Sequence, residues 1–339
     1  MKPRMRLLKC LAILGSMSIS STVWAAPKGD LWVSKHTPMP SKRVGFSTSA
    51  ANGKIYAIGG TDWDDEPRRG VVLRTVEEYD PLTNQWKRRE GMRSGRSFLA
   101  ATAANGRIYA TGGSVQLFWD RKHVEEYNPA TDTWERKADM LAARSEHFAN
   151  TVHGRIYVIG EAADGAVEEY DPAADRWEVK SALPERRGSF ATSVVDGKIY
   201  VIGGARWNPM RILATVEVYD PAADTWETRA DMPTPRFNLF ANAVNGIIYA
   251  IGGFSDAGRA LPTVEAYNPE TDTWETMAEM PEGRSGFSSS VVNERIYVFA
   301  GFNEFRRTVL IYTPPSRPPR SVDALGKAAT TWGRVKTGR

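Results

Sequence analysis

Cysteine and histidine are scarce in this sequence of 339 residues, which contains one cysteine and four histidines. The histidines fall in separate predicted strands or loops, without the spacing of metal ligands: His36, His123, His147 and His153. The sequence also lacks a phosphate-binding loop, a nucleophile elbow and a zinc-protease motif. We therefore expect no disulfide framework, no metal and no cofactor, and no motif assigns a catalytic residue.

Long apolar runs are also rare, and the main one lies near the amino terminus. The run from Cys10 to Ile19 follows four basic residues and precedes the small-x-small sequence Val23-Trp24-Ala25. This pattern predicts a secretory signal peptide over residues 1–25, although an uncleaved anchor would share it. After cleavage the chain would contain no cysteine and no membrane span, and we expect it in the periplasm or secreted.

The charge of the chain is uneven along its length. The 44 basic residues exceed the 40 acidic ones, but four bases lie in the predicted signal peptide, and residues 313–339 hold six bases and one acid. The body between them has a net charge of about −5, which argues against a nucleic-acid partner. The basic segment 313–339 contains two Pro-Pro pairs, so we predict an extended, disordered tail.

A signature built on tyrosine and tryptophan recurs every 43 to 49 residues. It reads Val-Glu-x-Tyr-Asx-Pro followed by Trp, with tyrosines at 79, 127, 170, 219, 267 and 312. A pair of small residues, mostly Gly-Gly, precedes each copy, at 59–60, 112–113, 160–161, 203–204, 252–253 and 300–301. An arginine stands 16 residues before each pair: Arg43, Arg96, Arg144, Arg187, Arg236 and Arg284. A period of this length indicates one repeated supersecondary unit.

Each unit contains four short runs with the alternation typical of β-strands. In the second unit these runs are Ser97–Ala103, Arg107–Thr111, His123–Tyr127 and Thr133–Lys137. Asn105-Gly106 separates the first two, and this dipeptide favours a type I′ hairpin turn. Four antiparallel strands repeated in this way predict a β-propeller.

The paired glycines, the Val-Glu-x-Tyr-Asx-Pro segment and the tryptophan together resemble the kelch family. The resemblance covers roughly residues 30–312 and implies an all-β, six-bladed kelch propeller over residues 26–312. The sixth unit ends in Pro314-Pro315, so its fourth strand must come from elsewhere. We predict that Leu31-Trp32-Val33 supplies it, because Trp32 precedes Arg43 by 11 residues where the other tryptophans precede their arginines by 10. Trp332 is a rival but lies 20 residues beyond Tyr312.

Strand order places the arginines and the loops after the glycine pairs at the same mouth of the propeller. We expect the arginines to begin the first strand of each unit. The loops differ in length, from 17 residues in the first unit to seven in the third, so they would form a cup with an open side. They contain aromatic residues outside the repeat, among which we select Trp63, Trp119 and Trp207 as binding candidates. Alternatively, these tryptophans only pack their own loops.

The six arginines have two interpretations. Five units place a glutamate two residues before the tyrosine, at Glu77, Glu125, Glu168, Glu217 and Glu265, and buried Arg–Glu ion pairs would account for the arginines structurally. The kelch resemblance also implies that arginines at this place face bound ligands. The sixth unit has Leu310 at the glutamate position, so Arg284 is our first candidate to meet an anion.

These features predict a monomeric, exported binding protein that recognises a glycan, a small anionic ligand or a protein partner at the central mouth. An enzymatic alternative comes from the resemblance, because exported six-bladed kelch proteins include sialic acid mutarotases, the N-acetylneuraminate epimerases. Anomer exchange needs only an acid–base group and an anion clamp. Glu146, two residues after Arg144, is the candidate acid–base group, and the arginines would hold the anion.

Overall fold

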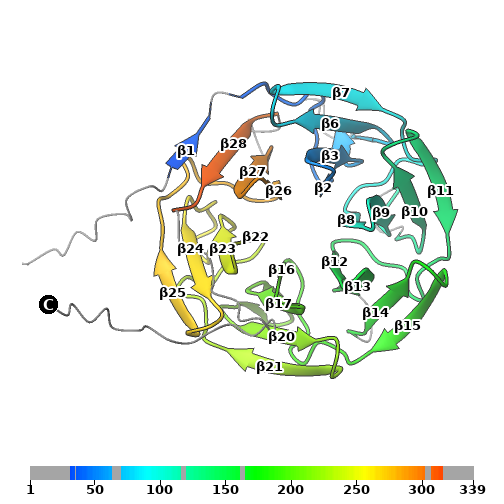
Figure 1. Cartoon of the computed structure of the whole chain (residues 1–339). Coiled ribbons are helices and arrows are strands. Elements are labelled where there is room, and N and C mark those ends of the chain that lie inside the picture. The colour runs from blue at the N-terminus through cyan, green and yellow to red at the C-terminus, as the bar shows by residue number, and fades with distance from the viewer. Residues whose placement is uncertain are drawn as a thin grey trace, which may run out of the picture.

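Six four-stranded antiparallel sheets stand radially around a central axis (Figure 1). The computed structural model describes residues 31–34, 36–62, 70–115, 120–160, 165–301 and 307–315. The predicted signal peptide and residues 316–339 of the predicted tail lie outside this described part. The described residues include no helix that is long and apolar enough to cross a bilayer.

Each blade runs from an inner strand beside the axis to an outer strand at the rim. The first blade contains β2 (Ser47–Ala51), β3 (Lys54–Ile58), β6 (Val76–Asp80) and β7 (Gln85–Arg89). The second contains β8 (Ala100–Ala104), β9 (Arg107–Thr111), β10 (Val124–Asn128) and β11 (Thr133–Lys137). The third contains β12 (Phe148–Val152), β13 (Arg155–Ile159), β14 (Val167–Asp171) and β15 (Arg176–Lys180).

The remaining blades repeat this order. The fourth contains β16 (Ala191–Val195), β17 (Lys198–Ile202), β20 (Val216–Asp220) and β21 (Thr225–Arg229). The fifth contains β22 (Phe240–Val244), β23 (Ile247–Ile251), β24 (Val264–Asn268) and β25 (Thr273–Thr276). The sixth contains β26 (Ser288–Val292), β27 (Arg295–Phe299), β28 (Val309–Thr313) and β1 (Leu31–Val33). Two small hairpins lie in the loops, formed by β4 (Thr61–Asp62) with β5 (Val71–Val72) and by β18 (Ala205–Trp207) with β19 (Met210–Ile212).

The amino-terminal strand closes the ring, as the sequence predicted. β1 pairs with β28 in antiparallel register, with Trp32 opposite Tyr312, and the two strands lie side by side in Figure 1. The two rings are 4.9 Å apart, close to the Tyr–Trp separation in the other blades. The indole Nε1 of Trp32 donates to the carbonyl of Ala278, 2.9 Å away, in the connection between the fifth and sixth blades.

The repeated tyrosine and tryptophan tie each blade to its neighbours. Tyr127 and Trp134 pair across strands with ring centroids 5.0 Å apart, and Tyr127 donates from its hydroxyl to Asp132 at 2.6 Å. Trp134 donates from its indole to the carbonyl of Glu90, 2.8 Å away, in the connection from the first blade. The hydrophobic core is likewise divided into clusters that combine side chains of adjacent blades, such as Ile58 with Ala110. The repeat signature therefore encodes contacts between blades as well as within them.

The paired glycines allow neighbouring blades to approach closely. A Cβ on Gly59 would lie 2.5 Å from the carbonyl oxygen of Arg96 in the next blade. The N–H of Gly60 donates to the same oxygen at 2.8 Å. Both glycines have positive φ, at 65° and 94°, so a side chain would be strained as well as crowded.

The predicted start of the innermost strand was wrong by three residues, and the difference matters for the site. The innermost strand of the second blade begins at Ala100 and not at Ser97, because Phe98 has a φ of 53° and turns the chain before the strand starts. Arg96 therefore lies in the loop before the strand and does not begin it. The same offset applies to the other five arginines.

Candidate functional site

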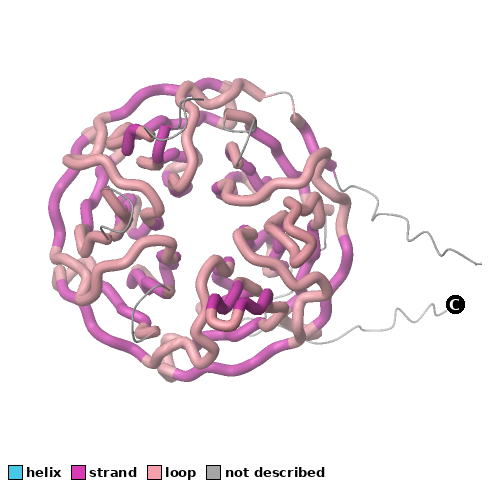
Figure 2. Tube along the Cα trace, turned by 180° about the vertical axis from the view of Figure 1, so that it is seen from behind, coloured by secondary structure: helices cyan, strands magenta, loops and turns pink. Residues whose placement is uncertain are grey.

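The loops that enter the innermost strands and those that follow the glycine pairs lie at one mouth of the propeller. Isolated backbone bridges join them, such as Ser97 with Ser114 and Phe237 with Phe254. Figure 2 views the ring from behind and shows loops reaching inward around the central axis. The sequence placed these two sets of loops at the same end, and the structure confirms it.

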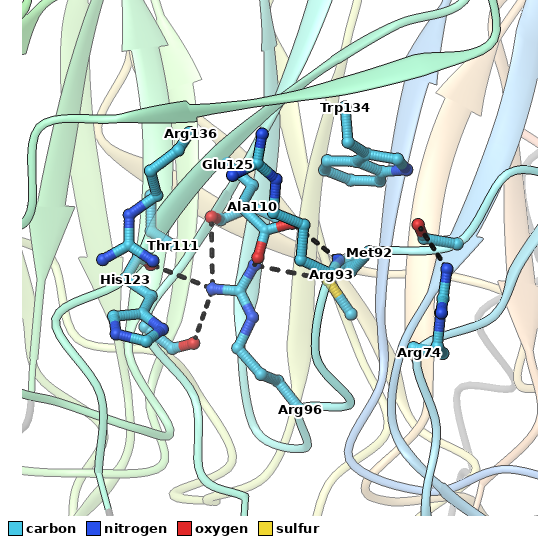
Figure 3. Close-up of polar contacts among 12 residues, drawn as sticks. Arg74, Met92, Arg93, Arg96, Ala110, Thr111, His123, Glu125, Trp134 and Arg136 are labelled. Carbon is cyan, nitrogen blue, oxygen red and sulfur yellow. Dashed lines mark hydrogen bonds and ion pairs between the residues drawn. The ribbon is translucent and has the colours of Figure 1, made fainter.

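The arginine of each loop enters its own blade rather than the central opening. The guanidinium of Arg96 donates from Nη1 to the carbonyls of Gly112, at 3.0 Å, and His123, at 2.9 Å. Its Nη2 lies 3.3 Å from Glu125, in a position where the arginine side chain is fully buried (Figure 3). The other carboxylate oxygen of Glu125 accepts the backbone N–H of Arg93 at 3.0 Å. This arginine thus fixes the ends of two strands in its blade.

The predicted Arg–Glu ion pairs are confirmed in all five blades that have the glutamate. The pairs are Arg43–Glu77 at 3.0 Å, Arg96–Glu125 at 3.3 Å, Arg187–Glu217 at 2.8 Å, Arg236–Glu265 at 3.1 Å and a short contact between Arg144 and Glu168. In the sixth blade Arg284 donates instead to the carbonyl of Ala300, at 2.9 Å, and to the hydroxyl of Thr308, at 2.5 Å. Each of the six arginines is buried.

Burial affects the charge of these groups only modestly. It lowers the pKa of Arg96 to about 10, against the opposing attraction of Glu125, and it lowers the pKa of Arg284 to about 10 as well. Both guanidinium groups remain charged at neutral pH. Their binding role stays a prediction, because none of the six arginines lines the central cavity described below and only Arg187 among them lines the pocket beside it.

The residue two positions after each arginine is the one that faces the centre. These six residues all have positive φ, between 52° and 61°, and all line the central cavity: Gly45, Phe98, Glu146, Ser189, Asn238 and Gly286. The backbone N–H of Glu146 donates to the carbonyl of Phe98 at 2.9 Å, and Asn238 donates to Ser189 at 2.7 Å. The left-handed turn thus joins adjacent blades and directs this position inward.

The central cavity has a volume of about 500 Å³. Aromatic rings form much of its wall, and Phe240 lies 5.8 Å from Phe148 and 5.1 Å from Phe287 between ring centroids. Hydroxyl and amide groups from the inner strands are interspersed, including Thr192 and Asn150. An apolar cavity of this size with a few polar groups is typical of a small-ligand site.

Two groups on this wall have altered acidity. Enclosure by the walls raises the pKa of Glu146, and the negative charge of Asp120 raises it further. Burial lowers the pKa of His147 to about 3, with further lowering by Arg144 and Arg96, so this imidazole is neutral at pH 7. Its Nε2 lies 2.9 Å from the hydroxyl of Thr111.

Of the three tryptophans selected from the sequence, Trp207 belongs to the described residues, and it reaches the cavity. Trp207 is 55% exposed, lines the cavity and lies edge-to-face against Phe237 with centroids 5.8 Å apart. It therefore packs its loop and also borders the site. Trp63 and Trp119 lie outside the described residues.

A second pocket of about 400 Å³ shares Trp207 with the central cavity. Arg186, Arg187 and Arg206 line it, between the third and fourth blades. Arg187 is paired with Glu217, and Arg206 lies 3.7 Å from Glu185. Basic groups at this mouth thus gather beside the central cavity and not within its described wall.

Phe98, Ser189 and Asn238 were missed as binding candidates in the sequence. The available signal was variation between the repeats. The position two residues after the arginine holds Gly, Phe, Glu, Ser or Asn, whereas the arginine itself is the same in all six units. Within the described residues no three His, Cys, Asp or Glu side chains are grouped as metal ligands would be.

Family models match most of the propeller. The Kelch motif matches residues 42–93 and 95–141, and the KLHDC2/KLHL20/DRC7 Kelch-repeats domain matches residues 166–301. This chain belongs to the kelch-repeat family.

Kelch relatives with curated sequences match only over short segments. Beta-scruin of Limulus polyphemus is 31% identical over 97 residues, which is 28% of this chain and 10% of scruin. The influenza virus NS1A-binding protein homolog of Mus musculus is 38% identical over 78 residues, 23% of this chain and 11% of that protein. The F-box/kelch-repeat protein At1g67480 of Arabidopsis thaliana is 32% identical over 104 residues, 31% of this chain and 26% of the relative. The chain thus matches about a quarter or less of the length of these relatives.

Among solved structures, that of YjhT superimposes with a TM-score of 0.69 and covers 82% of this chain and 95% of YjhT. The two sequences are 15% identical, so this similarity concerns the fold.

Proposed function

We propose that this kelch propeller is an exported protein that binds a glycan in its central cavity. The observation that carries the proposal is the position of Trp207 at the rim, with a carboxylate, a hydroxyl and an amide on the wall from successive blades. These polar groups belong to Glu146, Ser189 and Asn238. A sugar ring combines an apolar face, suited to an indole, with hydroxyls that need hydrogen-bond partners.

Binding to a panel of immobilised glycans tests the proposal, followed by titration calorimetry with each glycan retained. Trp207→Ala and Asn238→Ala should each weaken binding by about tenfold or more, since each removes a contact worth about 1.4 kcal/mol or more. Leu82→Ala is the matched control, because Leu82 is 85% exposed in a turn between the outer strands. Equal binding by all three variants would contradict a site at the central mouth.

A protein partner is the competing occupant. One relative is named as an NS1A-binding protein, and a loop of another protein could insert an apolar side chain into the same cavity. Retention of a protein in place of any glycan, with the same sensitivity to Trp207→Ala, would favour that assignment.

Export is supported by the sequence of residues 1–25. Amino-terminal sequencing of the protein after expression in a bacterial host tests it, with Ala26 expected as the first residue. A product that retains Met1 in the cytoplasm would contradict export.

A second candidate function is sugar mutarotation of the sialic acid type, favoured by Glu146. This carboxylate lies on the cavity wall with a raised pKa, as an acid–base group requires. In anomer exchange it would accept the proton of the anomeric hydroxyl and deliver that proton to the ring oxygen as the ring C–O bond breaks, which leaves a carbonyl group and a free hydroxyl. Ring closure on the other face of the carbonyl would reverse both proton transfers. The arginines of the adjacent pocket could hold the sugar carboxylate.

NMR of freshly dissolved sialic acid distinguishes the enzyme from the binding protein. Accelerated anomer exchange that is lost in Glu146→Gln would support the enzyme. Binding of a glycan without acceleration would support the binding protein.

A further inference from the structure

The charge on the cavity wall is of one sign in the part that the structure describes. Glu146 is the one acidic residue of this described wall, and the other ionisable residue, His147, is kept neutral by burial. The described wall includes neither lysine nor arginine. An anionic ligand group placed here would meet a carboxylate and no cation of the described wall.

The arginine ring does not reverse this charge. Five of the six arginines are neutralised within their blades by glutamates, as in the pair of Arg96 and Glu125. Arg284 belongs to the sixth blade, on the opposite side of the ring from Glu146 in the third blade (Figure 1). Near Glu146, the negative charge of Asp120 adds to the effect of burial in raising the pKa of Glu146.

Aromatic rings surround the same opening. Phe98 precedes Glu146 in the circle of inward-facing residues, and its ring leans over Gly45, where a Cβ would lie 3.0 Å from it. Trp207 stands at the rim with more than half of its surface exposed. The faces of such rings attract cations, and the attraction grows when the cation is removed from water.

We infer that the ligand carries a protonated amine, and that the cavity selects a sugar with a free amino group, whose ammonium donates to the carboxylate of Glu146. This inference rests on the proposed glycan-binding function and specifies its ligand class. The aromatic rings and the hydroxyl and amide groups of the wall would contact the rest of the sugar. The carboxylate supplies selectivity, because a charge-assisted hydrogen bond in an enclosed site is stronger than a neutral one.

A series of hexoses that differ in one substituent tests the inference on the full mature chain. Glucosamine carries the ammonium, glucose has a hydroxyl in its place, N-acetylglucosamine has a neutral amide, and glucuronate carries an anion on the same ring. Titration calorimetry at pH 7 should rank glucosamine at least tenfold above glucose and place glucuronate last.

Glu146→Gln should reduce the ratio of the glucosamine and glucose affinities to about one, because the amide keeps the shape of the side chain and removes its charge. Glu178→Gln is the matched control, since this glutamate lies on the outer strand β15 with its side chain 63% exposed. The control should keep the full ratio. Thermal unfolding of both variants verifies that they are folded.

The outcomes separate this inference from the function on which it rests. Equal affinities for glucosamine and glucose, both lost in Trp207→Ala, would overturn the inference and leave glycan binding intact. Tightest binding of glucuronate would overturn it in favour of an acidic sugar. Failure of every sugar to bind would overturn both. Tighter binding of Nα-acetyl-lysine methylamide than of glucosamine would replace the sugar with a lysine side chain of a protein.

Discussion

Replacement of Trp32 by alanine tests how the ring is closed. The closing strand β1 has three residues, and Trp32 contributes its ring contact with Tyr312 and its hydrogen bond to Ala278. Truncation of a fully buried tryptophan costs about 3–5 kcal/mol. Because Trp32 is only partly buried, we expect the lower end of that range, about 3 kcal/mol, of which the hydrogen bond and the aromatic contact supply roughly 1 kcal/mol each.

The assay combines thermal unfolding with amide hydrogen exchange. For a domain of this size a loss of about 3 kcal/mol corresponds to a fall in Tm of about 6–12 °C. Exchange should also become faster along β28, because this strand loses β1 as its hydrogen-bonded neighbour.

Trp226→Ala is the matched control. Trp226 makes the same contacts in the fourth blade, with Tyr219 at 5.0 Å and the carbonyl of Ser181 at 3.0 Å. Its strand β21 remains joined to β20 by a tight turn, so faster exchange should stay within that blade. A Tm within about 1 °C of the original for Trp32→Ala, or identical exchange patterns in the two variants, would refute closure by β1.

Three further predictions concern charge and strain. Arg96→Ala should lower the free energy of unfolding by about 3–5 kcal/mol in a denaturant titration, because it leaves Glu125 buried without its cation; a loss below about 1 kcal/mol would contradict this. The hydrogen bond from Tyr267 lowers the pKa of Asp272 below 3.8 in the folded protein. The ionised Asp272 therefore stabilises the fold above pH 3.8, and this stabilisation is lost as the pH falls through the folded pKa. Asp272→Asn should flatten the acid limb of a plot of Tm against pH. Glu146→Gly should raise the free energy of unfolding by about 1 kcal/mol, because glycine adopts the φ of 52° found at this position without strain. Thermal unfolding measures the change, and an unchanged or lower Tm would contradict the prediction.

The fold could be predicted closely from the sequence because its signals are repeated and local. Each Asn-Gly or Asx-Pro turn predicts its hairpin independently, and six similar units leave little choice of architecture. The closure was predictable as well, because Trp32 completes a spacing that the other units establish. The residue at which each innermost strand starts was not predictable. The left-handed turn at Phe98 depends on a hydrogen bond to Gly45 of another blade, and no local sequence pattern encodes that contact.

The site was less predictable than the fold. The constant arginines drew attention because charged residues at a mouth suggest ligand binding, but they make carbonyl contacts in every blade and an ion pair with glutamate in five of the six. The orientation of Arg96 and Phe98 is set by the turn between them, which sends one side chain into the blade and the other toward the axis. The sequence alone gives the two residues and their spacing, but it does not show that Arg96 enters the blade while Phe98 faces the axis.

The arginines hold the strands of each blade together, so ligand recognition is expected at the inward-facing positions two residues after them. A residue other than glycine at positive φ is strained by about 1 kcal/mol or more, and a glycine at the same place would relieve the strain. Gly45 and Gly286 show that the turn accepts glycine in this protein, so the side chains of Phe98, Glu146 and Asn238 are not required by the backbone. Structure alone gives no reason to keep a carboxylate on the cavity wall, where burial and the charge of Asp120 raise its pKa, whereas recognition of a cationic ligand does. If Glu146→Gly stabilises the protein and removes its preference for glucosamine over glucose, the strain at this turn is maintained for binding.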